Sequence, residues 1–264
     1  MDLKEICSSI SSIAIETGRY IMSESGEFNP GTAEKKAVND FVTHVDKGAE
    51  SFIVAELSKL LPEAGFIVEE KTSVKRGERY NWVVDPLDGT TNFIHKLHPF
   101  AISIALTEYG EPVAGVVHEA AGNESFSAWK GGGAWLNSER IYVSTAARPQ
   151  AALVSTGFPY KDFSRLDGYL HCLTWMMKNT MGIRRMGAAS IDLAYVACGR
   201  FEVFFEYGLN PWDIAAGALL VREAGGTVTD FKGAGENLTG ADIIASNHLL
   251  YPEFHKIISN FMVK

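Results

Sequence analysis

The chain of 264 residues is acidic, with 24 Lys and Arg against 32 Asp and Glu and a formal net charge of −8. Its 46% hydrophobic and 21% charged residues are typical of a folded globular protein and exclude a disordered one. The length allows one large domain or two packed ones, and the acidic balance makes nucleic acid an unfavourable partner. The surplus carboxylates are either a solvated surface or, in part, a cation site.

The first half of the chain is predicted to be α+β. Apolar residues at helical spacing predict surface helices over 3–20 and about 46–60, the second ended by Pro62. Strands are predicted over 66–68 and over 80–84, where Asp85-Pro86 ends the second. Short β-rich runs separated by turn residues then predict an antiparallel meander, with strands over 100–106, 112–118, 125–129, 134–136 and 140–143.

Strands and helices alternate in the second half, which predicts an α/β arrangement. The predicted strands cover 152–155, 202–205, 227–230 and 243–245, and the helices cover 166–178, 187–198, 212–224 and 251–262. No low-complexity linker separates the halves. We therefore expect one compact unit, divided into an N-terminal half over 1–147 and a C-terminal half over 148–264.

The compartment is indicated by the cysteines and the first residues. Cys7, Cys172 and Cys198 are few and far apart, which predicts reduced thiols. The first five residues lack the apolar region of a secretory signal, and the apolar stretches over 100–106 and 214–221 are too short to span a bilayer. We expect a cytoplasmic protein.

Several phosphate-handling motifs are missing from the sequence. It has no Gly-x-x-x-x-Gly-Lys loop, no Asp-x-Asp nucleophile pattern and no Cys followed by Arg at the spacing of a cysteine phosphatase. It also has no Gly-x-Ser-x-Gly elbow. A covalent phosphoenzyme or acyl-enzyme of these types is therefore not expected.

The most informative segment is Asp-Pro-Leu-Asp-Gly-Thr-Thr-Asn-Phe, which begins at Asp85. Asp85 and Asp88 follow an apolar strand, Gly89 lets the backbone approach a ligand, and Thr90 can open a short helix whose free N–H groups suit phosphate. Two carboxylates beside an anion site indicate a divalent cation between them, and Mg²⁺ prefers such oxygen ligands. The alternative, a turn rich in Asp and Asn, is common for a bare Asp-x-x-Asp but not for the full string.

This string resembles the metal-binding signature of the inositol monophosphatase family, within the wider Mg²⁺-dependent, lithium-sensitive phosphatase superfamily. Thr43-His44-Val45-Asp46, Glu69-Glu70 and the segment over 212–226 are similar to three further family elements, in the same order and spacing. The resemblance covers nearly the whole chain. It implies the layered α-β-α-β-α sandwich of the inositol monophosphatase and fructose-bisphosphatase type, a homodimer and inhibition by Li⁺.

The resemblance also implies a metal site with two Mg²⁺ ions, or three if a looser one binds. Glu70 would either bind that third ion or support the residues that bind the other two. Asp85 would bridge the two main ions, and Asp213 lies at the start of a helix, where the dipole favours a carboxylate. The implied ligands are Glu69, Asp85, the Leu87 carbonyl, Asp88 and Asp213.

The implied catalytic residues are Glu69, Thr90 and Asp46. Glu69 would act through the first metal, whose charge activates water, while Thr90 and Asp46 orient that water and take its proton. The alternative for Asp46 is an N-cap of the helix over 46–60. The backbone N–H groups of Gly89 and Thr90 would bind the phosphoryl oxygens.

Substrate contacts are implied for Asp88, Ala189, Glu206 and Asp213, since carboxylates suit the hydroxyl donors of a polyol. The alternative for Glu206 is a surface residue at a strand end. The roles of four basic residues are not decided by the sequence. Lys35 is favoured over Lys36 as the family's lysine near the metals, and Arg184-Arg185 either binds an anionic part of the substrate or is an exposed basic pair.

The expected activity is Mg²⁺-dependent hydrolysis of myo-inositol 1-phosphate or a related phosphorylated polyol. Rival substrates within the superfamily are fructose 1,6-bisphosphate, a 3′-phosphoadenosine nucleotide, NADP and histidinol phosphate. A rival of another class is a regulatory role in a transcription antitermination complex, which some bacterial members of the family have. With two divalent cations bound, about half of the acidic surplus is neutralised, so Mg²⁺ is expected to stabilise the fold.

Overall fold

The computed structural model describes residues 1–29, 31, 33–37, 40–160, 162–235 and 241–263. Its larger sheet has seven strands in the order β3-β4-β5-β6-β7-β8-β9, antiparallel except for the pair β3-β4. These strands are β3 (Gly65–Val68), β4 (Tyr80–Asp88), β5 (Ala101–Glu108), β6 (Glu111–Glu119), β7 (Glu124–Trp129), β8 (Gly133–Leu136) and β9 (Glu139–Ile141).

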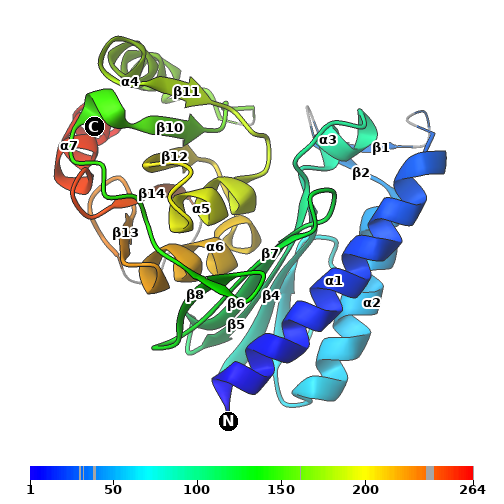
Figure 1. The fold of residues 1–264 in the computed structure, drawn as a ribbon. Helices are drawn as coiled ribbons and strands as arrows, with labels where there is room; N and C mark the ends of the chain where they lie inside the picture. Colours follow the sequence, from blue (N-terminus) through cyan, green and yellow to red (C-terminus); the bar gives the residue numbers. More distant parts are fainter. Residues whose placement is uncertain (30, 32, 38–39, 161, 236–240, 264) are drawn as a thin grey trace.

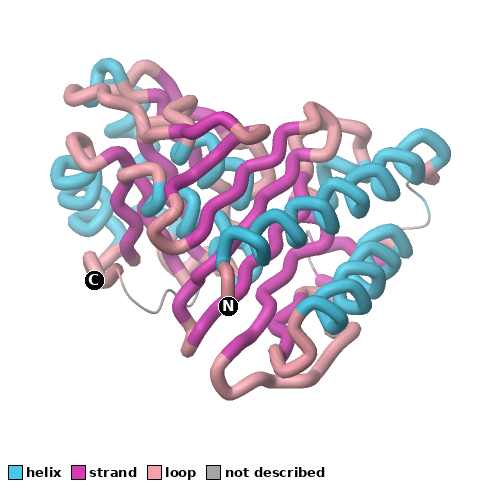
Figure 2. The backbone as a smooth tube through the Cα atoms, turned by 60° about the horizontal axis from the view of Figure 1, so that its bottom comes forward, coloured by secondary structure: helices cyan, strands magenta, loops and turns pink. Residues whose placement is uncertain are grey.

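Helices cover both faces of this sheet (Figure 1). Helices α1 (Leu3–Glu27) and α2 (His44–Leu60) lie side by side across one face, and Figure 2 shows the same pair from another side. Helices α5 (Ala189–Ala197) and α6 (Pro211–Glu223) pack against the other face, and one apolar core is continuous between them and the sheet. The first and second halves of the chain therefore share an extensive apolar contact.

A second sheet lies on the far side of α5 and α6. It has five strands in the order β11-β10-β12-β14-β13, of which β11, β10 and β12 are parallel and the other two pairs antiparallel. Its outer face carries α4 (Leu166–Asn179) and α7 (Tyr251–Met262), which completes the predicted α-β-α-β-α layering. The strands are β10 (Leu153–Thr156), β11 (Gly182–Arg184), β12 (Val203–Tyr207), β13 (Gly226–Thr229) and β14 (Asp242–Asn247).

Sequence patterns account for most of these elements. Ile6, Ile10 and Ile21 form the buried stripe of α1, and the Asp2 side chain caps its start by accepting from the Lys4 and Glu5 amides. The predicted helix over 251–262 is present with the same bounds, and the other three helices of the second half are present with ends shifted by at most two residues. The meander is confirmed in β5 to β9. The division into halves at 147/148 stays a prediction.

Several elements were not predicted. They are short, so they carry little periodicity: the antiparallel pair β1 (Glu34–Ala37) and β2 (Asp40–Val42), strand β11, and the 3₁₀ turn η2 (Pro149–Ala151). The predicted end of a strand at Asp85-Pro86 is wrong, because β4 runs on to Asp88. The pairing with β5 shifts register between Asp85 and Asp88, and this irregularity accommodates Pro86, which has no N–H to donate.

All three cysteines are free thiols, as predicted, and two of them are buried. None of the helices in the part of the chain that the structure describes is long and apolar enough to cross a membrane.

Candidate active site

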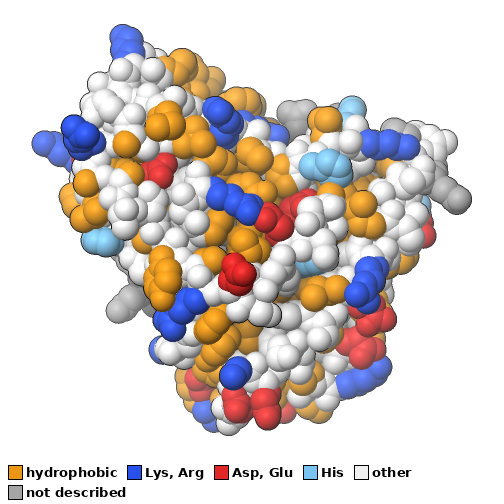
Figure 3. Space-filling view, viewed as in Figure 1, with side chains coloured by type: hydrophobic (Ala, Val, Ile, Leu, Met, Phe, Trp, Pro, Cys, Tyr) orange, Lys and Arg blue, Asp and Glu red, His pale blue; other side chains and the backbone are white. Residues whose placement is uncertain are grey.

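A pocket of about 420 Å³ opens between the two sheets. It is bounded by the end of β4, the start of α3 (Thr90–Ile94), the segment after β10, the segment leading into α5, the end of β12 and the start of α6. Acidic side chains lie beside a basic one near the middle of this face of the molecule (Figure 3). The predicted site residues that line the pocket are Glu69, Asp85, Leu87, Asp88, Gly89, Thr90, Ala189, Glu206 and Asp213.

The irregular end of β4 sets the direction of its two aspartates. Asp85 is 2% exposed, and its Oδ1 accepts a hydrogen bond of 2.9 Å from the Leu87 amide. Asp88 extends towards α5, where its Oδ2 accepts from the Ser190 amide at 2.7 Å and from the Ser190 hydroxyl at 2.6 Å. The two carboxylates are therefore fixed by different elements although they are only three residues apart.

Gly89 is required by its backbone conformation. Its φ of 90° lies in the left-handed region, and a Cβ there would lie 3.1 Å from the Pro99 carbonyl oxygen and 3.4 Å from the Ala188 Cβ. Gly89 is also the N-cap of α3, so the predicted short helix after Asp88 is confirmed. The first free amides of α3 consequently lie at the wall of the pocket, beside Thr90.

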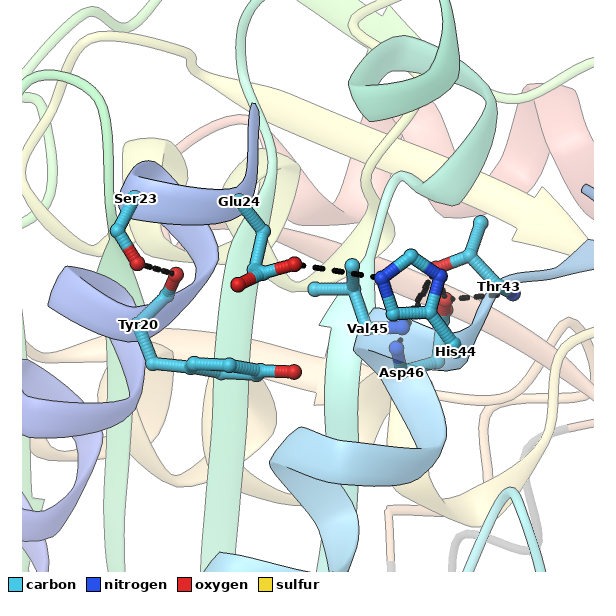
Figure 4. Close-up of polar contacts among 7 residues, drawn as sticks. All are labelled: Tyr20, Ser23, Glu24, Thr43, His44, Val45 and Asp46. Atoms are coloured by element: carbon cyan, nitrogen blue, oxygen red, sulfur yellow. Dashed lines mark hydrogen bonds and ion pairs between the residues drawn. The ribbon is translucent and has the colours of Figure 1, made fainter. Parts of the chain in front are cut away.

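Thr90 and Asp46 are brought together from segments far apart in the sequence. The Thr90 hydroxyl lies 3.0 Å from Asp46 Oδ1 and 3.0 Å from the Leu87 carbonyl oxygen. Asp46 Oδ2 accepts from the amide and the hydroxyl of Thr43, which is the true N-cap of α2 (Figure 4). Asp46 is thus the third residue of a capping box, so the alternative that it is itself the N-cap is wrong, and its second oxygen remains for Thr90.

The start of α2 is also tied to α1. Figure 4 shows His44 Nε2 facing Glu24 Oε2, at 3.3 Å. Phe28, just after α1, stacks on the ring of the same histidine. These contacts fix the first turn of α2, and with it the position of Asp46.

Asp213 lies in the first turn of α6, as predicted. Pro211 occupies the first turn as well, and Asp213 Oδ2 accepts from the Asn210 amide at 2.6 Å in a second capping box. The other carboxylate oxygen is left for the pocket. Asp46 and Asp213 are thus each held at the start of a helix by a capping box.

The carboxylates raise one another's pKa. Burial is the main cause for each, and like charge adds to it: Glu69, Asp88 and Asp213 all raise the pKa of Asp85 well above its usual range. Burial and Asp88 raise the pKa of Asp213 to about 8, while burial raises that of Asp88 to about 6 against the hydrogen bonds from Ser190. Asp88 and Asp213 still touch pocket solvent, so the carboxylates face a shared space rather than the core.

This donor set fits a hard divalent cation. It consists of carboxylates and one carbonyl, which are the ligand types that Mg²⁺ prefers, and their mutual repulsion disappears when positive charge is added. In the described ranges, however, no three His, Cys, Asp or Glu side chains are already gathered closely enough to hold a metal ion.

Glu206 and one residue of the arginine pair also line the pocket. Glu206 is buried near the end of β12, not at the surface, and Gly157 makes room for it, since a Cβ on Gly157 would lie 2.0 Å from Glu206 Oε1. Burial, with Asp213 and Asp88 adding to it, raises the pKa of Glu206 to about 8. Both arginines of the pair are exposed, and Arg185 lines the pocket.

Three functional positions escaped the sequence reasoning. Asp192 lines the pocket from α5, Ser190 holds Asp88, and Asn92 donates to the carbonyls of Pro99 and Met186. A single Asp in the otherwise apolar run Ser-Ile-Asp-Leu-Ala was the available signal for Asp192. The side chains of Lys35 and Lys36 lie outside the described residues.

Glu69 and Glu70 form a bend after β3. Glu69 enters the pocket, as predicted. The bend is held by Glu50 of α2, which is fully buried and accepts from the Glu70 amide at 2.7 Å and from the amide and hydroxyl of Thr72 at 2.8 Å each. Glu50 lies one turn after Asp46 and thus links the two segments.

Replacing Glu50 with alanine is expected to lower the free energy of unfolding by about 1–3 kcal/mol, because three donors of the bend lose their partner. Urea unfolding measures this loss. Glu56→Ala, on the same helix but paired only with the exposed Lys59, is the control and should change stability by less than about 0.5 kcal/mol. Equal effects of the two substitutions would contradict the role given to Glu50.

Comparisons with known proteins agree with this geometry. The model of the inositol monophosphatase family matches residues 2–261. The chain is 47% identical to the "Nus factor SuhB" of Pseudomonas aeruginosa over 89% of this chain and 88% of that one, and 40% identical to the "Inositol-1-monophosphatase" of Mesorhizobium japonicum over 90% of each. The crystal structure of the "extragenic suppressor protein suhB" from Bartonella henselae superposes with a TM-score of 0.91 at 38% identity, covering 96% of this chain and 98% of that one. The protein therefore belongs to the inositol monophosphatase family.

Proposed function

We propose that this protein is a Mg²⁺-dependent phosphomonoesterase that acts on myo-inositol 1-phosphate or a related phosphorylated polyol. The observation that carries the proposal is the set of acidic side chains around one pocket, next to a Thr–Asp pair joined by a hydrogen bond of 3.0 Å. Family membership supports the phosphatase chemistry.

Glu69, Asp85, Asp88, Asp213 and the Leu87 carbonyl would hold two Mg²⁺ ions. When bound, such ions lower the pKa of water and offset the charge that develops on phosphoryl and leaving oxygens. A third, looser ion near Glu70 remains part of the proposal.

Thr90 and Asp46 are suited to handle the proton of the attacking water. A hydroxyl carries a single proton, so Thr90 donates either to Asp46 or to the Leu87 carbonyl at one time. When it donates to Asp46, its lone pairs can accept from the water and the Leu87 carbonyl is left for a cation. As the water attacks, its proton passes to the Thr90 hydroxyl oxygen, and the proton of that hydroxyl passes to Asp46 Oδ1. Burial raises the pKa of Asp46, which makes its carboxylate a stronger base than that of an exposed aspartate.

The remaining contacts bind the ester. The amides of Gly89 and Thr90 would donate to the phosphoryl oxygens at the start of α3. Asp88, Asp213, Glu206 and the segment at Ala189 would receive the hydroxyls of the polyol, which are donors that match an acidic wall.

Phosphate release from myo-inositol 1-phosphate is expected to require Mg²⁺ and to fall with millimolar Li⁺. The measurement is a phosphate assay over inositol phosphates, sugar phosphates and nucleotides, with Mg²⁺ and with EDTA. Equal release in EDTA would reject the metal mechanism. A faster reaction with fructose 1,6-bisphosphate, a 3′-phosphoadenosine nucleotide, NADP or histidinol phosphate would keep the chemistry and replace the substrate.

A second candidate function, a regulatory role in transcription antitermination, is favoured by the relatives named Nus factor SuhB. The acidic charge disfavours direct RNA binding, so such a role would act through protein contacts. A catalytically inactive Asp213→Asn protein separates the two functions, because it would keep a regulatory role and lose a purely enzymatic one. The homodimer and the cytoplasmic location belong to the same set of proposals.

A further inference from the structure

Asp192 is a buried carboxylate with an oxygen left unsatisfied. It lies in the first turn of α5, is 1% exposed, and its Oδ1 has no hydrogen-bond partner among the residues that the structure describes. The Ser155 hydroxyl lies nearby, but its Oγ is also without a partner of normal hydrogen-bond geometry. An orphaned acceptor of this kind costs free energy unless something else donates to it.

The surroundings of Asp192 connect it to the pocket. Asp192 is one of the pocket-lining residues, together with Glu206, Asp88 and Arg185. Apart from burial, the groups that act on its pKa are the carboxylates of Glu206 and Asp88, which raise it, and the Ser155 hydroxyl and Arg185, which lower it. Arg185 lowers the pKa of Asp88 and Glu206 as well, so one guanidinium offsets part of the charge of three acids.

A ligand with several hydroxyls fits this wall. Glu206 is pressed against Gly157 and Asp192 is held by a buried helix, so both carboxylates are rigid acceptors. Both acids line the same pocket and are near enough for the charge of Glu206 to act on Asp192, so they can accept from two hydroxyl donors of one ligand. A missing donor then leaves one acceptor unpaired in a buried site. The phosphate end of the ligand would remain at Gly89 and Thr90, on the other side of the pocket.

We propose that Asp192 accepts a hydrogen bond from a ring hydroxyl of the substrate, next to the hydroxyl bound by Glu206, and thereby determines which polyol phosphates are hydrolysed. The inference rests on the proposed phosphatase function and adds the requirement for a pair of neighbouring hydroxyls. Asp192 acts on specificity and touches no reacting atom.

The test compares Asp192→Ala, which removes both acceptor oxygens, with the unaltered protein on two substrates in Mg²⁺. One is myo-inositol 1-phosphate, and the other is p-nitrophenyl phosphate, which has no hydroxyl to bind. The variant should lose about 10–100-fold in kcat/KM on the polyol ester and less than about 3-fold on the nitrophenyl ester. Glu202→Gln is the control, since this buried acid bonds the Leu153 amide outside the pocket and should leave both values unchanged.

Deoxy analogues of the polyol ester give a measurement that needs no variant. Removal of one particular hydroxyl should cost the unaltered protein about as much as Asp192→Ala does, and should cost the variant almost nothing more. An equal loss on both esters, or no deoxy analogue hydrolysed more than about 3-fold less well, would overturn the inference. No hydrolysis of either ester by the unaltered protein would instead overturn the proposed function.

Discussion

Asp213→Asn is expected to reduce phosphate release by about a thousand-fold while making the metal-free protein more stable. A bound divalent cation contributes several kcal/mol to the transition state, and about 4 kcal/mol corresponds to a thousand-fold in rate. The stabilisation follows from the pKa of Asp213, which burial and Asp88 raise to about 8. Near neutral pH the folded protein disfavours the ionised form of this carboxyl group, whereas the unfolded chain favours it. An amide of the same shape carries no charge and so avoids this cost.

The cap of α6 should survive the substitution, because the asparagine oxygen can still accept from the Asn210 amide. Thermal unfolding in EDTA should therefore show a higher midpoint, by about 2–4 °C for each kcal/mol gained. Asp167→Asn, in the exposed first turn of α4, is the matched control and should change neither activity nor midpoint. A normal rate for Asp213→Asn would show that the ligand assignment is wrong, and a lower midpoint in EDTA would show that the carboxylate stabilises the empty pocket.

The sequence was sufficient to predict that the carboxylates at the end of β4 and the start of α6 line the pocket. Asp85, Asp88 and Gly89 occur in one short string whose chemistry is local: a carboxylate pair, a residue that tolerates positive φ and a helix start. Asp213 was also predictable, because Pro211 and the following apolar run mark a helix start. Such features depend on neighbours within a few residues, so they can be read from the sequence before the tertiary fold is known.

The positions of Asp192 and Glu50 were harder to predict because they depend on contacts with segments far away in the sequence. Asp192 reads as one polar residue in an apolar helix, and only the packing of α5 between the two sheets brings it to the pocket. Glu50 likewise reads as a polar residue of a surface helix. It lies one turn after Asp46, and its carboxylate oxygens find donors only because the bend at Glu70 and Thr72 folds back onto α2.

The run of β4 through Pro86 illustrates the same limit. Proline normally ends a strand, and the rule fails here because the register with β5 shifts at that point. The shift cannot be inferred from residues 80–88 alone, since it depends on which residues of β5 lie opposite. The direction of Asp88 towards Ser190 is a consequence of this long-range pairing.

The stability of the metal-free protein is expected to fall as the pH rises from about 4 to about 8. Burial raises the pKa of Asp213 and Glu206 to about 8 and that of Asp88 to about 6, from ordinary values of 3.8 for Asp and 4.5 for Glu. The folded state therefore binds more protons than the unfolded state across this interval, so raising the pH favours unfolding. The stabilisation is complete below the ordinary values and is lost as the pH passes the raised ones.

Mg²⁺ should oppose this trend, because its ligands must be ionised and binding releases their protons. The rise in unfolding midpoint on adding saturating Mg²⁺ is thus expected to be small near pH 5 and large near pH 8, where fewer protons compete with the cation. Thermal unfolding in EDTA and in Mg²⁺ over this range measures both curves, and Asp213→Asn should flatten the EDTA curve. Parallel curves in EDTA and Mg²⁺ would contradict the assignment of these carboxylates to a cation site, since a cation bound elsewhere would leave their titration unchanged.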